Sequence, residues 1–139
     1  MIGLILNGKK PLVSVARTTP VSEIAALLHH HRIGAVLVVE GGNIFGLVSE
    51  RDICAGLHTH GCDILTVTAG EIMSSPVVTA SPNDSVVAAM EVMTDRRFRH
   101  LPVVEGGRIL GLVSIGDLVK RRIEDAEAEA SAMKEYIAS

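Results

Sequence analysis

The chain has 139 residues and a formal net charge of −3; 47% of its residues are hydrophobic and only 2% are aromatic. This length can bury a full core, and the apolar content indicates a globular protein. The negative charge and the scarcity of aromatic side chains argue against nucleic-acid binding. The longest apolar run is about five residues, far below the roughly 20 that a membrane-spanning helix needs, so we expect no membrane partner.

Apolar periodicity and turn residues predict alternating helices and strands along the whole chain. The expected helices cover residues 2–8, 21–31, 50–57, 69–73, 84–96 and 115 onward. The expected strands cover residues 12–15, 35–39, 44–48, 77–79, 100–104 and 109–113. Residues 58–63 read as a polar loop.

Two further features bear on the compartment. The N-terminal stretch Met1–Leu6 lacks a basic region and a cleavage site, so we expect no signal peptide. Cys54 and Cys62 are too few for a disulfide framework, which favours a reducing environment. A cytoplasmic location is therefore expected.

The sequence repeats itself with an offset of 65 residues, without a gap from Pro11 and Pro76 to Asp52 and Asp117. Each copy contains two apolar stretches around a Gly-Gly pair, which predicts a tight hairpin whose turn needs positive φ. Each hairpin leads into a helix. With only two copies, the repeat predicts a pseudo-twofold pair rather than a solenoid.

A serine and an aspartate mark the point where each hairpin becomes a helix. Ser49 and Ser114 occupy N-cap positions, with Asp52 and Asp117 three residues later. A helix N-terminus offers free amide donors and a positive dipole end, which suit a phosphate, and an aspartate there can accept hydrogen bonds from a ribose. The alternative is that serine and aspartate only cap the helix.

The motif Gly-Leu-Val-Ser-x-x-Asp, present twice, and Met-Ser-Ser-Pro-Val-Val-Thr before the second copy resemble a tandem CBS-domain pair, the Bateman module. The resemblance covers roughly residues 2–120. It implies an α/β fold of two pseudo-twofold-related CBS units (β-α-β-β-α) packed through their sheets. The first unit would cover residues 1–65, the second 66–122, and a C-terminal helix extension 123–139.

The resemblance also implies a function. Such modules are non-catalytic sensors that bind an adenine nucleotide in clefts between the units: AMP first, then ATP or ADP, or NADH. They commonly form a homodimer and modulate a protein partner, which the sequence does not name. No catalytic constellation or phosphate-binding glycine loop is apparent, so we expect no enzyme activity.

The same resemblance places two sets of site residues. A basic pair precedes Leu101 in the second copy, and an arginine fork suits phosphate. We therefore expect the main cleft there, built from Thr79, Phe98, Arg99, His100, Leu101, Ser114 and Asp117. The second cleft lacks that pair and would comprise Ser14, Ile33, Gly34, Ala35, Val36, Ser49, Arg51 and Asp52.

Two alternatives to nucleotide binding remain open. His58, His60 and Cys62, with Cys54, could serve a metal- or redox-responsive module, although closed metal sites usually take four ligands from two pairs and no second pair is evident. The other alternative is a ligand-free dimerisation scaffold.

The last predicted helix carries apolar residues at alternating spacings of four and three, which is a heptad pattern. Either this stripe packs back on its own domain or it packs against a partner copy. The stripe comprises Val119, Ile123, Ala126, Ala130, Met133 and Ile137.

Overall fold

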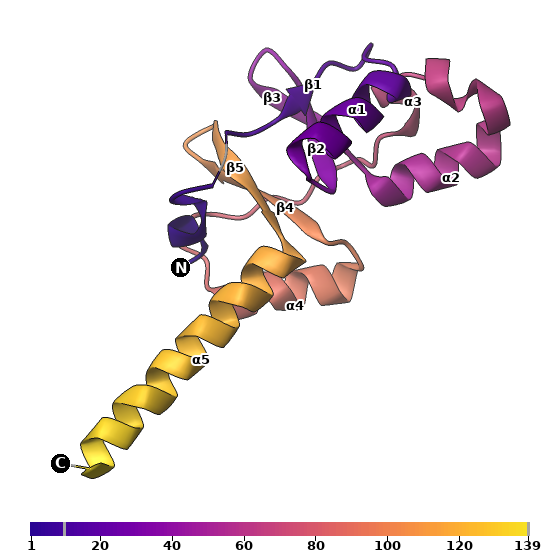
Figure 1. The fold of residues 1–139 in the computed structure, drawn as a ribbon. Helices are drawn as coiled ribbons and strands as arrows, with labels where there is room; N and C mark the ends of the chain where they lie inside the picture. The colour runs from indigo at the N-terminus through magenta and orange to yellow at the C-terminus, as the bar shows by residue number, and fades with distance from the viewer. Residues whose placement is uncertain (10, 139) are drawn as a thin grey trace. The chain divides into compact units, whose positions relative to one another are not determined.

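The computed structural model describes residues 1–9 and 11–138 and is a mixed α/β structure, as predicted (Figure 1). Its helical segments are η1 (Ile2–Leu6), α1 (Val21–His31), α2 (Glu50–His60), η2 (Gly61–Thr66), α3 (Ala69–Ile72), α4 (Val86–Arg96) and α5 (Ile115–Ala138). Its strands are β1 (Ser14–Val15), β2 (Ala35–Glu40), β3 (Asn43–Ser49), β4 (His100–Glu105) and β5 (Arg108–Ser114).

The two hairpins have the same register, 65 residues apart. Ala35 pairs with Ser49 in β2–β3, and His100 pairs with Ser114 in β4–β5. Both ladders shift at the same point, between residues 38 and 39 and between residues 103 and 104. The Gly-Gly turns have positive φ at both positions (58° and 79°; 57° and 77°), as a type I′ turn requires. The hairpin prediction is confirmed.

Packing divides the chain into two compact units, each of which contains one repeat. The N-terminal unit runs from Pro11 to Val78. The C-terminal unit begins at Thr79 and also includes the leader, which we define as residues 1–9. The boundary predicted from the sequence lies between residues 65 and 66, whereas the compact units divide between Val78 and Thr79.

The leader is tied to the C-terminal unit by main-chain hydrogen bonds. The amide of Ile2 donates to the carbonyl of Asp84, and that of Gly3 to the carbonyl of Pro82, both at 2.9 Å. The Ile2 side chain is fully buried. Leu6 lies beside Gly111, where an added Cβ would come within 2.8 Å of Cδ2 of Leu6. The leader is thus part of the core of the C-terminal unit.

The strand predicted over residues 77–79 does not form. In the N-terminal unit β1 pairs with β2 through both Ser14 and Val15, but its counterpart contributes a single bridge, Ala80 to Val103. A ladder extended by one residue would need the N–H of residue 102, and Pro102 has none. Proline therefore ends this ladder where Leu37 continues the other.

The polar loop predicted over residues 58–63 is also wrong. Helix α2 continues to His60, and η2 follows directly. The cause is a packing contact: Ile64 of η2 is buried and lies against Gly56, which has no side chain to obstruct it. Helix α4 begins at Val86, later than predicted, because the Ser85 hydroxyl accepts from the Ala88 amide at 3.0 Å and caps the helix.

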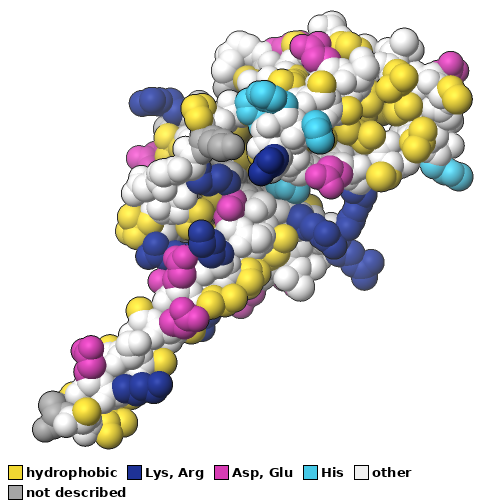
Figure 2. All heavy atoms as spheres, in the orientation of Figure 1, with side chains coloured by type: hydrophobic (Ala, Val, Ile, Leu, Met, Phe, Trp, Pro, Cys, Tyr) yellow, Lys and Arg dark blue, Asp and Glu magenta, His cyan; other side chains and the backbone are white. Residues whose placement is uncertain are grey.

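In the described part of the chain, no helix combines the length and apolar character that crossing a membrane requires. Helix α5 packs on its own unit near its start, where Leu118 is fully buried. Farther along, Figure 2 shows hydrophobic and charged side chains alternating on its surface.

Candidate functional site

In the N-terminal unit, Ser49 and Asp52 form the predicted capping box at the start of α2. The Ser49 amide donates to Oδ2 of Asp52 at 2.8 Å, and the Asp52 amide donates to the Ser49 hydroxyl oxygen at 3.3 Å. The hydroxyl of Ser74 donates to the other carboxylate oxygen, Oδ1, at 2.8 Å. Both oxygens of Asp52 therefore already accept hydrogen bonds within this unit.

In the C-terminal unit, Ser114 and Asp117 make the same reciprocal pair at the start of α5. The Ser114 amide donates to Oδ2 of Asp117 at 2.9 Å, and the Asp117 amide donates to the Ser114 hydroxyl oxygen at 3.1 Å. The further donor to the carboxylate, which is Ser74 in the N-terminal unit, is Lys9 here. The ammonium group of Lys9 donates to Oδ2 of Asp117 and, at 2.9 Å, to the carbonyl of Leu112.

These contacts leave one oxygen of Asp117 available. Among the described residues, none donates a hydrogen bond to Oδ1 of Asp117, whereas Ser74 occupies the same position on Asp52. Burial raises the pKa of the Asp117 carboxyl, but hydrogen bonds from Lys9 and Ser114 and the charge of Lys9 outweigh burial and lower that pKa below 3.8. Asp117 is thus held as a carboxylate with one oxygen that accepts no hydrogen bond from the described residues.

Sequence reasoning missed both Lys9 and Ser74, yet the repeat relates them. They lie 65 residues apart, and so do Asp117 and Asp52. The segment before each repeat therefore reaches the aspartate of the other repeat. Extending the comparison of the two repeats to the residues before Pro11 and Pro76 would have matched Lys9 with Ser74 and shown that one is a cation and the other a hydroxyl.

The expectation of free amide donors at the helix starts is partly wrong. The amide of Glu50, first in α2, donates to the carbonyl of Gly34 at 3.0 Å. The amide of Ile115, first in α5, donates to the carbonyl of Arg99 at 2.8 Å. Because the aspartate amides bond to the capping serines, two of the first three amides of each helix are already satisfied.

The other predicted residues differ in burial. In the C-terminal unit, Leu101 is buried, Phe98 and His100 are half-buried, and Thr79 and Arg99 are exposed. In the N-terminal unit, Ala35 and Val36 are buried at the start of β2. Ser14 on β1 and Arg51 in the first turn of α2 are exposed, and Ile33 and Gly34, before β2, are half-buried.

The N-terminal unit also has an open groove of about 810 Å³ between the end of α1 and the start of α2. Ile33 and Gly34 of the predicted second cleft line it, but Ser49 and Asp52 do not. The structure therefore separates the predicted residues of this unit into two groups. The other lining residues include His29, Arg32 and Cys54.

The residues of the metal alternative do not converge. His58 and His60 lie two positions apart in the last turn of α2, so their side chains diverge. Within the described part of the chain, no three His, Cys, Asp or Glu side chains are placed to hold a metal ion. The structure offers no support for a metal centre at Cys62.

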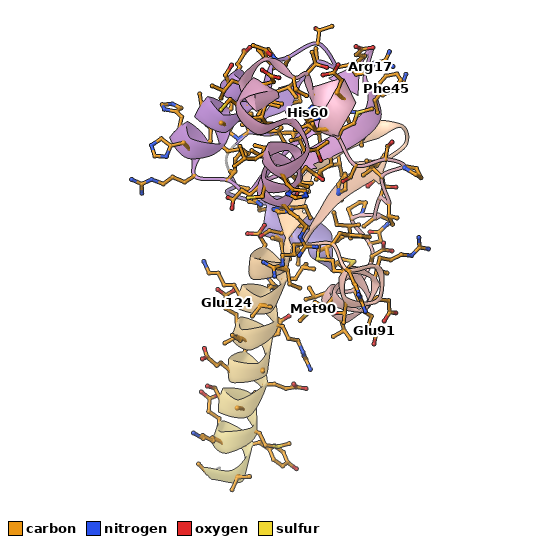
Figure 3. All side chains as sticks on the ribbon, turned by 90° about the vertical axis from the view of Figure 1, so that its right-hand side faces the viewer. Arg17, Phe45, His60, Met90, Glu91 and Glu124 are labelled. Atoms are coloured by element: carbon orange, nitrogen blue, oxygen red, sulfur yellow. The ribbon has the colours of Figure 1, made fainter. Side chains whose placement is uncertain are left out.

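A separate cluster lies at the turn end of the N-terminal hairpin, where Figure 3 labels Arg17 and Phe45. The Arg17 guanidinium lies 4.2 Å from the centre of the Phe45 ring and donates to Glu40 at 2.8 Å. Both side chains of the ion pair are partly exposed to solvent. The cluster therefore connects the loop after β1 to the surface of the hairpin.

Comparison with known proteins agrees with the repeat. Residues 8–59 and 69–124 match the CBS domain. The mitochondrial CBS domain-containing protein CBSX3 of Arabidopsis thaliana is 33% identical over 112 residues, which cover 77% of this chain and 54% of that protein. The chain thus spans about half the length of this curated relative.

Two solved structures are also similar. A CBS-domain-containing protein of Agrobacterium tumefaciens has a TM-score of 0.83 and 36% identity, covering 87% of this chain and 98% of that one. A CBS domain protein of Pyrobaculum aerophilum, solved in complex with AMP, has a TM-score of 0.73 and 32% identity, covering 84% and 88%. With both repeats matched, the chain belongs to the CBS-domain family.

Proposed function

We propose that this protein is a non-catalytic regulatory module whose C-terminal unit binds an adenine nucleotide, AMP in preference to ADP, ATP or NADH. The observation that carries the proposal is the geometry of Asp117, an ionised carboxylate at a helix start with one oxygen to which no described residue donates. The AMP complex of the Pyrobaculum relative supports the ligand class.

The chemistry of a ribose fits this acceptor. A ribose diol presents two hydroxyl donors, and a carboxylate is a strong acceptor for them. Asp117 is fixed by the Ser114 amide and by Lys9, so it loses little freedom when a ligand binds. Lys9 also supplies a positive charge beside the carboxylate, and the Arg99 carbonyl, just before β4, accepts from the first amide of α5.

The N-terminal unit is the weaker candidate. Ser74 and Ser49 donate to both oxygens of Asp52, so a ribose hydroxyl would have to replace an existing hydrogen bond. Exchanging one hydrogen bond for another gains little free energy. We therefore expect one dominant binding event, in the unit that carries Lys9.

The regulatory part of the proposal follows from linkage. A ligand shifts a conformational equilibrium only by as much as it prefers one state. The Lys9–Asp117 contact joins the leader to the start of α5, so a ligand that shares the Asp117 carboxylate with Lys9 changes how tightly the leader is held. The regulated partner and the proposed homodimer would respond to that change.

Isothermal titration calorimetry with AMP, ADP, ATP and NADH tests the proposal. We expect AMP to bind most tightly, Asp117→Asn to weaken binding about tenfold or more, and Asp52→Asn to have a smaller effect, since hydrogen bonds to charged groups contribute roughly 1.5–3 kcal/mol. Asp125→Asn, on the exposed face of α5, is the matched control. ATP should be recovered intact after incubation.

Three results would contradict the proposal. Hydrolysis of ATP by the purified chain would refute a non-catalytic module. Equal losses in Asp117→Asn and Asp52→Asn would remove the preference for the C-terminal unit. Absence of heat with every nucleotide, together with an unchanged melting temperature, would leave the ligand-free scaffold.

A further inference from the structure

Helix α5 carries an apolar stripe that its own unit leaves uncovered. The stripe comprises the residues Val119, Ile123, Ala126, Ala130, Met133 and Ile137. Exposure rises along it, from 39% at Val119 and 52% at Ile123 to 61% at Met133 and 77% at Ile137. A regular stripe that grows more exposed with distance from its anchor is not explained by the folding of this unit alone.

The stripe follows a heptad pattern, with Ile123, Ala130 and Ile137 at one core position and Val119, Ala126 and Met133 at the other. Most positions that flank such a core are charged: Lys120, Glu127 and Lys134 on one side, and Arg122 and Glu129 on the other, where Tyr136 follows. None of these five makes an ion pair within the described residues. The ion pair between two residues of α5, Arg121 to Asp125 at 3.2 Å, lies on the outer face.

We propose that the stripe is the docking surface for α5 of a second copy of this chain, parallel and in register. In a parallel pair, a flanking residue that directly precedes Ile123 or Ala130 lies opposite the residue five positions farther along the other helix. Arg122 then faces Glu127 of the second copy, and Glu129 faces Lys134 of the second copy. By symmetry each pair occurs twice, so every contact between two charged flanking residues is between opposite charges.

Antiparallel pairing fits less well. Aligning the two stripes along their full length would place Lys120 against Lys134 and Glu127 against Glu127, so like charges would meet. The antiparallel register that avoids this repulsion is centred between Glu124 and Asp125. It leaves Ile137, the most exposed residue of the stripe, without a partner.

Two features of the helix favour pairing over its limited length. Ala126 and Ala130 let the two backbones approach closely at the centre of the stripe. Helix α5 is also anchored at its base, since Leu118 is buried in its own unit, which reduces the ordering cost on association. This inference does not depend on nucleotide binding.

Cysteine cross-linking of the full chain tests the arrangement. In a background with Cys54→Ser and Cys62→Ser, Met133→Cys should form a disulfide-linked dimer under mild oxidation. Ala128→Cys, on the outer face of the same helix, is the matched control and should stay monomeric on a non-reducing gel. In the charge-matched antiparallel register the two residues at position 133 would lie about 25 Å apart along the helices and would not cross-link.

A charge swap gives a second test that does not require a cysteine. Arg122→Glu or Glu127→Arg alone should raise the dimer dissociation constant of α5-mediated association roughly tenfold, measured by sedimentation, because two attractive pairs become repulsive. The double variant should restore wild-type association. Glu135→Lys, on the outer face, should change nothing, and circular dichroism would confirm that each variant keeps its helix.

The outcomes separate cleanly. A cross-link at position 133 with recovery in the double variant supports parallel self-pairing. A double variant weaker than either single one overturns it in favour of the antiparallel register, where Arg122 meets Glu129. No cross-link at position 133 and no effect of any charge change would show that a second copy does not cover the stripe.

Discussion

Lys9 donates to the carboxylate of Asp117 across 108 positions of sequence. In the other unit the corresponding donor is the neutral hydroxyl of Ser74, on Asp52. The repeat has kept the position of the contact and changed its chemistry. A cation on one aspartate and a hydroxyl on the other make two units of the same fold electrostatically different.

Replacing Lys9 should raise the pKa of Asp117. In Lys9→Met the carboxyl loses a hydrogen bond and a positive charge, while burial, which raises the pKa, remains. The pKa should therefore move upward from its lowered value. Carboxyl-detected NMR titration of wild type and Lys9→Met would measure this, with Lys120→Met as the control. An unchanged Asp117 pKa would show that Lys9 is not its partner in solution.

The same shift predicts how acid affects stability. The pKa of Asp117 is lowered in the folded state, so its ionised form stabilises the protein above the ordinary value of 3.8. This contribution disappears as the pH falls from there through the folded pKa. Urea unfolding at a series of acidic pH values should show a steeper loss in wild type than in Lys9→Met. If the free energy of unfolding falls equally with pH in the two proteins, the ionisation of Asp117 is not linked to stability through Lys9.

Removing the Ser74 hydroxyl should destabilise the N-terminal unit. Ser74→Ala leaves Oδ1 of Asp52 without its donor, at a cost of about 0.5–1.5 kcal/mol in the free energy of unfolding. Chemical denaturation measures the change, and Ser75→Ala, one residue along, is the control. If both variants unfold at the same denaturant concentration as wild type, this hydrogen bond does not contribute to stability.

Side chains added at Gly46 and Gly111 should have unequal effects although the repeat makes the two positions equivalent. A Cβ at Gly46 would lie 2.5 Å from Sδ and 3.0 Å from Cβ of Met73, whereas a Cβ at Gly111 would meet only the flexible end of Leu6, at 2.8 Å. We expect Gly46→Ala to cost about 1–3 kcal/mol and Gly111→Ala less. Melting temperatures of the two variants would show the order, and a reversed order would contradict the packing described.

Helix α1 ends at an arginine in a conformation that favours glycine. Arg32 has φ 54° and ψ 48°, the left-handed region, which costs a side-chain-bearing residue roughly 1 kcal/mol or more. Arg32→Gly should therefore raise the free energy of unfolding, although glycine loses more backbone entropy on folding and reduces the gain. Arg32→Ala, which keeps a Cβ, is the control and should give no gain.

The features that the sequence predicted well are set by neighbouring residues. The hairpins depend on Gly-Gly turns flanked by apolar residues, and the capping boxes on a serine and an aspartate three residues apart, so both appear at the expected positions. The extended helix α5 follows from an uninterrupted heptad pattern. Each of these elements can be predicted without knowing what lies across the core.

The features that the prediction missed depend on contacts between elements, which form only when the chain folds. Whether residues 77–79 form a strand is decided by the missing N–H of Pro102, on another segment. The extension of α2 depends on the packing of the Ile64 side chain against Gly56. The environment of Asp117 depends on Lys9, which no local pattern links to it. For the candidate site, the repeat identified the carboxylates, and only the fold revealed their donors.

The leader gives the two units different positions in the order of synthesis. Every residue of the N-terminal unit has been made once the ribosome has added Val78, so this unit can fold on the emerging chain. The leader is made before that unit, yet its hydrogen-bond partners include Asp84, Leu112 and Asp117, which are made after it. The contacts of the leader therefore form only after the N-terminal unit is complete, and a chain stalled before α5 would carry a finished N-terminal unit and a Lys9 without its partner Asp117.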